Sequence, residues 1–426
     1  MSKPLFVISA PFDTYSGYGA RSRDVIKSII KSDKYNVKLL SQRWGSTPWG
    51  FINNHKEDWG FLTEYLMNPQ EQNRQPDIWM QITVPNEFQP YGKYNIGMTA
   101  GMETTVVDVS WIQGMNRMDI NFVSSEHSKN SFLNSTYEQQ QNGQRTGIVK
   151  MEKPIEVLFE GANLDTYFPD NGPCIVDFNI PESFAYLFVG HWMQGDMGED
   201  RKNVGYLIKA FLETFKNTLN PPALVLKSSG SGASYADRND ILKKIHQIKK
   251  TVKGKLPNIY LLHGEFTDEE MNSIYNHSKV KAMVSLTKGE GFGRPLLEFS
   301  LTKKPIIVSG WSGHTDFLNP EFTTLLNGEL KNVHPSAVVP NMILAESQWF
   351  QPSASDVGAK LKDVWKNYKK YLDGAKRQAY FSKTNFSWEK MDEKLNDYLT
   401  KFVPKFATEV KLKLPKLNKI ELPKKK

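Results

Sequence analysis

The stretch KGEGFGRPLLEFSLTKKPIIVSGWSGHTDFL, residues 288–318, decides the interpretation of the whole sequence. An apolar run leads into its glycine-rich turn, and a helix is expected to begin near Arg294 and Pro295, because proline suits the first turn of a helix. Gly291 and Gly293 would let the backbone approach a ligand closely. Backbone N–H groups and the positive end of the helix would then face that ligand, so the stretch predicts a binding place for phosphate or hydroxyl oxygens.

Two acidic side chains flank this turn. Glu290 lies in the turn, and Glu298 follows eight residues later, about one turn into the expected helix. A carboxylate accepts two hydrogen bonds from a vicinal diol, so two carboxylates beside a phosphate site would suit a sugar on one side and a ribose on the other. An ordinary helix start, in which acidic residues match the helix dipole, explains the same spacing equally well.

Buried-type strands and amphipathic helices alternate on both sides of this stretch. The apolar runs predict strands, and the residues between them have helical spacing. The predicted strands are 5–10, 36–41, 78–82, 94–99, 120–124 and 155–158, then 185–190, 223–228, 258–264, 281–287 and 305–309. This order favours an α/β fold with parallel sheets covered by helices on both faces.

A proline- and asparagine-rich segment, FPDNGPCIVDFNIPES (168–183), is the expected boundary between two domains. We therefore expect one Rossmann-like domain over 1–170 and a second over 171–385. Two domains of this size fit the length of 426 residues.

The element EGFGRPLLE resembles the Glu-x7-Glu element of the retaining, metal-independent glycosyltransferases of family four. That resemblance implies the GT-B fold, in which two facing, doubly wound Rossmann-like domains enclose a cleft, with the acceptor on the first and the nucleotide-sugar donor on the second. It implies that Glu290 contacts the hydroxyls of the donor sugar and that Glu298 holds the ribose. The backbone that would lie against the sugar and the diphosphate belongs to Gly291, Phe292, Gly293 and Arg294.

Further motifs follow in the order of that family. SGYG (16–19) resembles the glycine loop that faces the donor phosphates, which gives Gly17 and Gly19 a donor-binding role. EVLFEGANLDTYFP (156–169) resembles the segment that ends the first domain of the family. In FVGHWMQGDMGEDRKNVGYLIKAF (188–211), Lys202 matches the lysine that binds the diphosphate. Lys202 and Glu290 are thus the expected catalytic groups of the second domain.

The sequence departs from the family in one cationic position. The usual arginine after the strand is His191 here. Arg201, or Lys227 at the end of the next strand, could supply the missing charge. A lysine at a strand end is costly unless it has a partner, which makes Lys227 a phosphate candidate, although a surface lysine is the simpler alternative.

The catalytic group of the first domain is the hardest to place. The segment 97–132 resembles relatives that carry a glutamate at this strand end, which indicates Glu103. Asp108 and His127 are weaker alternatives, and His127 lies at an expected helix start, where a capping or packing role is more common. His314, after the following strand, is a further candidate for contact with the donor.

Several other chemistries find no support in the sequence. No Asp-x-Asp pair occurs, the eight His have no metal-ligand spacing, and neither a Walker A motif nor a G-x-S-x-G elbow is present. We therefore expect no metal and no cofactor. Cys174 is the only cysteine, no apolar run could span a membrane, and the N-terminus lacks the features of a signal peptide, so a cytoplasmic location is expected.

The positive charge of the chain is concentrated at its end. A helix over 386–403 is expected to cross back onto the first domain, as in family four, and 404–426 is a lysine-rich tail. This tail holds eight Lys and two Glu, so it supplies +6 of the net +8, and the remaining chain is almost neutral. A solvated appendage is the simplest interpretation, and weak contact with an anionic surface or a partner's strand edge is the alternative.

Together these patterns indicate transfer of a sugar from a nucleoside diphosphate sugar to an acceptor hydroxyl, with retention. The expected acceptor is a glycan or a lipid-linked sugar. A modified DNA base is the second candidate, because the chain resembles glycosyltransferases carried by large tailed phages, in which case it would act in the host cytoplasm. The rival functions are a nucleotide-sugar epimerase of the same fold and a sugar-binding protein without activity, which His191 favours.

Overall fold

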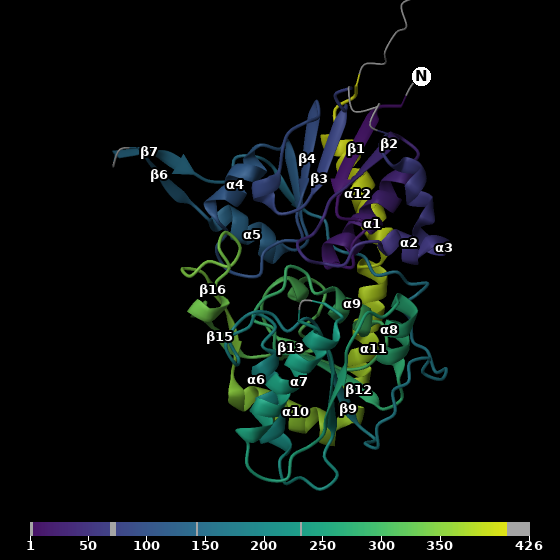
Figure 1. Cartoon of the computed structure of the whole chain (residues 1–426), viewed down its shortest axis with the longest axis vertical. Helices are drawn as coiled ribbons and strands as arrows, with labels where there is room; N and C mark the ends of the chain where they lie inside the picture. Colours follow the sequence, from purple (N-terminus) through teal and green to yellow (C-terminus); the bar gives the residue numbers. More distant parts are fainter. Residues whose placement is uncertain (1–2, 69–73, 142–143, 231, 407–426) are drawn as a thin grey trace, which may run out of the picture.

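The computed structural model describes residues 3–68, 74–141, 144–230 and 232–406. Each half of the chain forms a six-stranded sheet, and the two sheets lie one above the other in Figure 1. All neighbouring strands within these two sheets are parallel, and helices cover both faces of each. The two-sheet α/β architecture expected from the sequence is confirmed.

The first sheet has the order β2-β1-β3-β4-β5-β8. Its strands are fully or largely buried, as expected for a parallel sheet packed between helices, except for the edge strand β2, in which only Val37 and Leu39 are buried. They are β1 (Leu5–Ala10), β2 (Asn36–Ser41), β3 (Ile78–Ile82), β4 (Tyr94–Met98), β5 (Ile120–Val123) and β8 (Ile155–Val157). The accompanying helices are α1 (Gly17–Lys31), α2 (Phe51–Asn54), α3 (Lys56–Trp59), α4 (Val109–Asn116) and α5 (Glu126–Asn134), with the 3-10 turns η1 (Gly60–Tyr65) and η3 (Pro85–Glu87).

The second sheet has the order β11-β10-β9-β12-β13-β14. Its strands are β9 (Ala185–Val189), β10 (Ala223–Lys227), β11 (Ile259–Leu262), β12 (Val280–Ser285), β13 (Ile306–Ser309) and β14 (Thr324–Leu326). Around them lie α6 (Val204–Phe215), α7 (Tyr235–Lys250), α8 (Asp268–Asn276), α9 (Arg294–Ser300), α10 (Ala354–Lys366) and α11 (Tyr368–Asn385), with the 3-10 turns η4 (Gly313–Asp316) and η5 (Pro335–Ala337). The helix predicted near Arg294 and the capping box of Thr267 and Glu270 are both present.

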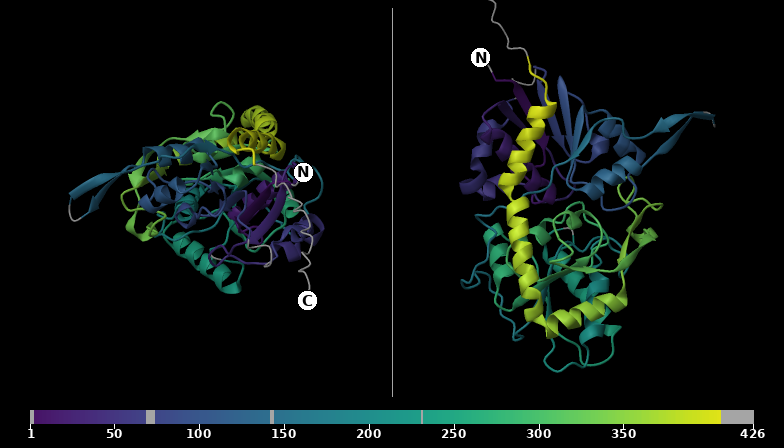
Figure 2. Two further views of the ribbon diagram at one scale, coloured as in Figure 1. Left: turned by 90° about the horizontal axis from the view of Figure 1, so that it is seen from above. Right: turned by 180° about the vertical axis from the view of Figure 1, so that it is seen from behind.

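The last helix, α12 (Trp388–Phe402), returns to the first half and packs against α1. Figure 2 shows this helix running on from the second half along the back of the first. Its buried stripe includes Met391 and Leu395, and Asp392 accepts hydrogen bonds from Ser28 and Lys31 of α1. One hydrophobic cluster therefore contains side chains of both halves, so the two halves are in direct contact.

Two antiparallel hairpins were not predicted from the sequence. β6 (Tyr137–Gln141) and β7 (Gln144–Val149) form an arm that projects from the first half in Figure 1. β15 (Gly328–Asn332) and β16 (Gln348–Pro352) form the other hairpin, on the second half. All five residues of β15 are exposed, so this strand lacks the apolar run that revealed the others.

Within the ranges that the structure describes, no helix combines the length and the apolar character needed to cross a lipid bilayer. The lysine-rich tail expected over 404–426 lies outside the described residues except for 404–406.

Candidate active site

The topology of the second sheet fixes where a ligand would bind. From β9 the chain builds the sheet outward through β10 and β11, and then returns to the other side of β9 with β12. Loops after β9 and β12 therefore diverge at the carboxyl ends of two neighbouring strands. Ligands of open α/β sheets bind in the crevice at such a switch point. His191, Arg201 and Lys202 follow β9, and Glu290 follows β12, so four predicted site residues come from these two loops.

The structure brings Glu290 and Lys202 into direct contact. Lys202 Nζ lies 2.6 and 2.8 Å from the two carboxylate oxygens of Glu290, and Arg201 Nη1 lies 3.4 Å from one of them. Burial alone would raise the pKa of Glu290, but Lys202 and then Arg201 outweigh it and hold this pKa at about 2. Glu290 is therefore an anion at any physiological pH. Burial lowers the pKa of Lys202, and Glu290 counteracts this effect.

Glu103 joins this group from the first half. Its carboxylate lies 3.6 Å from Arg201 Nη1, so Arg201 faces acidic side chains of both halves. The backbone around Glu103 also lies close to the loop after β12, because a Cβ atom on Gly289 would overlap the carbonyl of Glu103. Glu103, the residue that the sequence indicated for the first half, thus lies close to the group formed by Arg201, Lys202 and Glu290.

The glycine loop itself packs against the first half. A Cβ atom on Gly291 would lie 2.5 Å from the carbonyl oxygen of Ala100, and Ser124 Oγ donates to the carbonyl of Gly291. Gly293 has φ 100° and precedes α9, a conformation that favours glycine. The small size of Gly291 thus serves contact between the halves in this structure, which the sequence analysis did not anticipate. The side chain of Phe292 points away into the core, where its ring lies 4.8 Å from that of Phe317.

Glu298 belongs to a second buried network. It accepts hydrogen bonds from Arg294 Nε at 3.0 Å and from the Tyr275 hydroxyl at 3.1 Å. Burial raises the pKa of Glu298 to about 7, even though Arg294 acts to lower it. Arg294 Nη1 also lies 2.6 Å from Asp24 of α1. Arg294 therefore joins the two halves, a role that its sequence neighbours did not reveal.

His191, in the loop after β9, lies near three basic side chains, those of Lys227, Lys202 and Arg201. His191 accepts or donates one hydrogen bond through Nδ1 to Ser229 Oγ, at 2.9 Å. Burial, followed by the charges of Lys227, Lys202 and Arg201, lowers the pKa of His191 to about 4, so its ring is neutral. Lys227 Nζ lies 5.5 Å from the Phe266 ring, and among the described residues it has no carboxylate within ion-pair distance. Lys227 is therefore a cation available to an anionic ligand.

Four further candidates from the sequence are the glycines Gly17 and Gly19 of α1 and the two alternatives to Glu103, Asp108 and His127. Gly17 begins α1 with open space on its side, whereas a Cβ atom on Gly19 would overlap Thr14. Asp108 caps α4 by accepting from Ser110 N, so it serves local structure. His127 packs edge-on against Trp311, with ring centroids 4.5 Å apart.

His314 is fully buried beside the glycine loop. Its Nε2 lies 2.6 Å from the carbonyl oxygen of Ser309, so Nε2 carries the proton and Nδ1 is an acceptor. Nδ1 has no hydrogen-bond partner among the described residues, which is costly for a buried nitrogen. This nitrogen is available to a hydroxyl group of a ligand.

Two polar residues near the centre were not singled out in the sequence. Glu160, three residues after the end of β8, is buried, and burial raises its pKa against the opposing charges of Arg21 and Arg294. The Tyr18 hydroxyl bonds to Thr99 Oγ1, and the ring stacks on Trp44 at 3.8 Å between centroids. An acidic residue directly after an apolar run was the signal that could have identified Glu160.

Neither a protein-family model nor a curated protein matches the sequence, but its structure is similar to solved structures. Sucrose-phosphate synthase from Thermosynechococcus elongatus has a TM-score of 0.59 at 12% identity, covering 94% of this chain and 98% of that one. A glycosyltransferase from Rickettsia africae has a TM-score of 0.57 at 15% identity, covering 95% and 99%. The chain has the GT-B fold. Anabaena HepE in complex with UDP-glucose shares it, with a TM-score of 0.55 at 10% identity over 93% of this chain and 100% of that one.

Proposed function

We propose that the protein is a glycosyltransferase that moves a sugar from a nucleoside diphosphate sugar to an acceptor hydroxyl with retention. One observation carries this proposal: the buried Glu290 is held ionised by Lys202 and Arg201 at the switch point. The similar HepE was solved with UDP-glucose, and a study of the similar trehalose-6-phosphate synthase concerns glycosyltransfer with retention. A fold shared at this identity supports the proposal and leaves the reaction to be tested.

The leaving diphosphate sets the main requirement of the reaction. Its negative charge grows as the bond to the sugar breaks, so fixed cations stabilise the transition state more than the ground state. Lys202, with Lys227 and the amides of the glycine loop, supplies this stabilisation in our proposal. Glu290 accepts hydrogen bonds from hydroxyls of the donor sugar, and Glu298 accepts those of the ribose. The chemistry assigned to these side chains requires no metal.

Glu103 is the proposed catalytic group of the first half. It comes from the first half, and its carboxylate and that of Glu290 both lie near Arg201 Nη1. A carboxylate in this place would stabilise positive charge that develops at the anomeric carbon, or would orient the acceptor hydroxyl.

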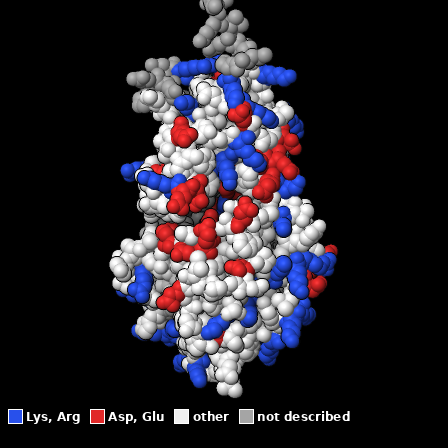
Figure 3. Space-filling model, turned by 90° about the vertical axis from the view of Figure 1, so that its right-hand side faces the viewer, with Lys and Arg blue, Asp and Glu red and all other residues white. Residues whose placement is uncertain are grey.

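We propose a glycan or a lipid-linked sugar as the acceptor in preference to a modified DNA base. A duplex is bound mainly through its phosphates, which requires a basic face on the protein. On the face shown in Figure 3, Lys and Arg are interspersed with Asp and Glu and form no single basic surface. The almost neutral charge of the chain outside 404–426 supports the same choice.

The proposal is tested by donor hydrolysis and transfer with purified protein. Donors are first chosen by thermal shift with UDP-, GDP- and ADP-sugars. Lys202→Ala is expected to lower turnover by about 10²–10³-fold, the usual effect of removing one charge-stabilising group. Glu298→Ala is expected to raise the KM for the donor with a smaller change in kcat. Lys216→Ala, a surface lysine of the same half, is the matched control.

Unchanged turnover in both Lys202→Ala and Glu298→Ala would contradict the assignment of these residues to the donor site. Conversion of the donor without an acceptor, seen by NMR of the sugar nucleotide, would instead identify an epimerase. Tight nucleotide binding without turnover on any acceptor would identify a sugar-binding protein. Activity that is lost in EDTA and restored by a divalent cation would contradict metal independence.

A further inference from the structure

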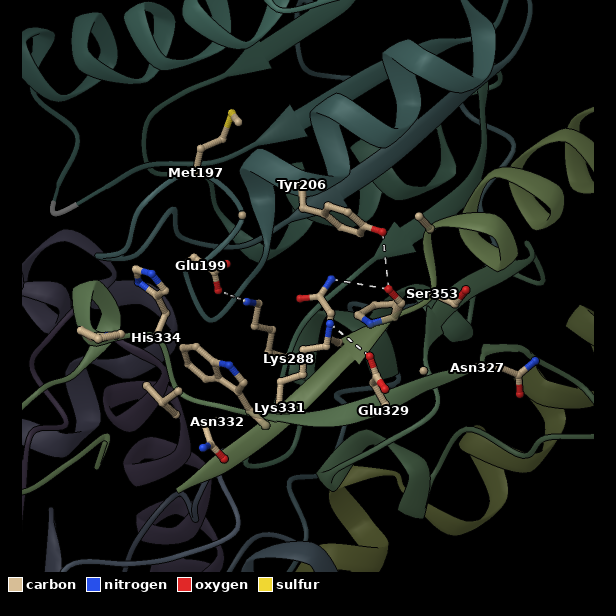
Figure 4. A pocket seen from close by; sticks show the side chains of 18 residues that line it. Met197, Glu199, Tyr206, Lys288, Asn327, Glu329, Lys331, Asn332, His334 and Ser353 are labelled. Atoms are coloured by element: carbon tan, nitrogen blue, oxygen red, sulfur yellow. Dashed lines mark hydrogen bonds and ion pairs between the residues drawn. The ribbon is translucent and has the colours of Figure 1, made fainter. Parts of the chain in front are cut away.

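A large pocket lies behind the donor loop, outside the residues assigned above. It has a volume of about 1020 Å³ and is enclosed by the segment after β9, the start of α6 and the β15–β16 hairpin (Figure 4). Ligand sites in proteins usually measure about 300–1,000 Å³, so this hairpin pocket is large enough for a ligand of more than one ring.

The hairpin pocket and the donor site share two neighbouring segments. The backbone N–H of Lys288 donates to the carbonyl of Arg201, and Arg201 Nη1 donates to the carbonyl of Gly289. From this paired backbone, Lys202 and Glu290 meet at the donor site, whereas Glu199 and Lys288 line the hairpin pocket. A ligand in the pocket would therefore lie on the other side of the same two segments.

The charges of the hairpin pocket are already matched within it. The buried Lys288 lies 2.8 Å from Glu199, and the exposed Lys331 lies 3.1 Å from Glu329 (Figure 4). His334 is bonded to Ser336 through Nδ1. A phosphate at the buried Lys288 would have to displace Glu199, and, unlike the donor site with Lys227, the pocket has no lysine outside an ion pair among its described lining residues. An uncharged ligand does not meet this cost.

The pocket also offers polar atoms and rings together. Trp349 is only 1% exposed, and its indole N–H, which has no hydrogen-bond partner among the described residues, still reaches open space. Tyr206 and Gln351 line the same space and interact with each other, and each also makes a long hydrogen bond, of 3.5 Å, to the carbonyl of Pro352. A lipid chain would cover these donors and acceptors without pairing them, which is unfavourable. Hydroxyl-rich rings with apolar faces match both features.

We propose that the hairpin pocket binds an uncharged oligosaccharide, namely a part of the acceptor distant from the hydroxyl that reacts. This proposal rests on the proposed function. The hairpin is well placed for such a role, because it also contacts the first half. Thr105 N donates to the carbonyl of Gln348 at 3.0 Å, and Gln348 N donates to Thr105 Oγ1 at 2.9 Å. A glycan held by the hairpin is thereby held by a segment that touches both sides of the cleft.

The test measures glycan binding without any donor, on an array of neutral, sulfated, phosphorylated and sialylated oligosaccharides. Neutral oligosaccharides of two or more units are expected to bind, and the best of them is then titrated in solution. Trp349→Phe keeps an aromatic ring but removes the indole N–H and the five-membered ring, so it should weaken binding at least about three- to tenfold, the effect of losing one hydrogen bond. Tyr206→Ala should weaken it at least as much.

Tyr380→Ala is the matched control, since this tyrosine is 74% exposed on α11 and does not line the pocket. Melting temperatures report whether each variant folds, and the Kd for UDP, GDP or ADP should stay within about twofold of the parent value. The proposal is overturned if no neutral oligosaccharide binds, if only anionic glycans bind, or if both variants bind as the parent does. Absence of nucleotide binding would count against the proposed function alone, because the glycan measurement does not depend on it.

Discussion

Glu290, in the glycine loop, and Glu298, in the helix α9 that follows this loop, experience opposite electrostatic conditions. Glu290 has two cations within 3.4 Å and a pKa of about 2, whereas Glu298 has Arg294 and a tyrosine hydroxyl and a pKa of about 7. The difference arises because burial raises the pKa of Glu298 more than Arg294 lowers it, and the negative charge of Asp268 adds to the rise. The two side chains therefore differ in charge near neutral pH, although nothing in the sequence distinguishes their ionisation.

The raised pKa of Glu298 predicts a pH-dependent effect on stability. The unfolded state loses this proton near pH 4.5, whereas the folded state keeps it until about pH 7. The folded state binds more protons between these values, so the free energy of unfolding falls as pH rises through this range, by roughly 3 kcal/mol at most. Glu298→Gln should match the parent melting temperature at pH 5 and exceed it at pH 8. The measurement is thermal unfolding without nucleotide.

If the difference in melting temperature between the parent and Glu298→Gln is the same at pH 5 and at pH 8, the raised pKa of Glu298 is contradicted. Asp356→Asn, at the start of α10 and far from the network, controls for general effects of losing a carboxylate.

At the scale of single residues, the sequence predicted those that follow strand ends. The resemblance to family four indicated Glu290 and Lys202 and left Arg201 as one of two candidates for a missing charge, and the structure brings these three side chains together. The pairing of Arg294 with Asp24 could not be predicted, since 270 residues separate them and their contact depends on how the two halves face each other. The ion pair of Lys288 and Glu199 could not be predicted either, because neither residue belongs to a periodic pattern of the sequence.

Secondary-structure elements show a related contrast. Strands buried on both faces are continuous apolar runs, which is why nearly all of them were predicted within a residue or two. The β15–β16 and β6–β7 hairpins have exposed, polar strands, so their sequences resemble loops. The glycine loop before α9 was recognised, but the reason for Gly291 was found only in its contact with the first half.

The contact of Gly291 leads to a prediction about this loop. A methyl group there would lie 2.5 Å from the carbonyl oxygen of Ala100, whereas one on Gly17 would meet nothing within 4 Å. Gly291→Ala should therefore lower the free energy of unfolding by about 1–3 kcal/mol, the usual cost of overpacking. Gly17→Ala should change it by less than about 0.5 kcal/mol. Urea unfolding of both variants measures the difference, and equal stability would mean that the loop moves away freely.

For the molecule as a whole, the described structure has its two halves in contact across the cleft. Hydrogen bonds cross between them at separate places, including Thr105 N to the Gln348 carbonyl and Glu126 N to Asp316. Glu290 is only 6% exposed in this arrangement. A donor can therefore reach Glu290 only when the halves separate or the loops between them move.

Native-state hydrogen exchange distinguishes these two motions. If the halves separate as rigid bodies, the amides of Thr105 and Glu126 should exchange with the same opening free energy, below that of global unfolding. Ile96, in the middle of the first sheet, should exchange only with global unfolding. Different opening free energies for Thr105 and Glu126 would indicate that the loops move independently. Binding of a nucleoside diphosphate should change the opening free energy that the amides of Thr105 and Glu126 share.

The course of α12 has a consequence for biosynthesis. Ser28 and its partner Asp392 are separated by 364 residues, so a ribosome that has made all of the first sheet has not yet made the helix that covers α1. The apolar side of α1 that faces Met391 and Leu395 must wait, uncovered, while the entire second sheet is synthesised and folds. Domains usually fold in the order in which they emerge. Here the half that is made first is the one completed last, and nascent chains are most exposed to aggregation during that interval.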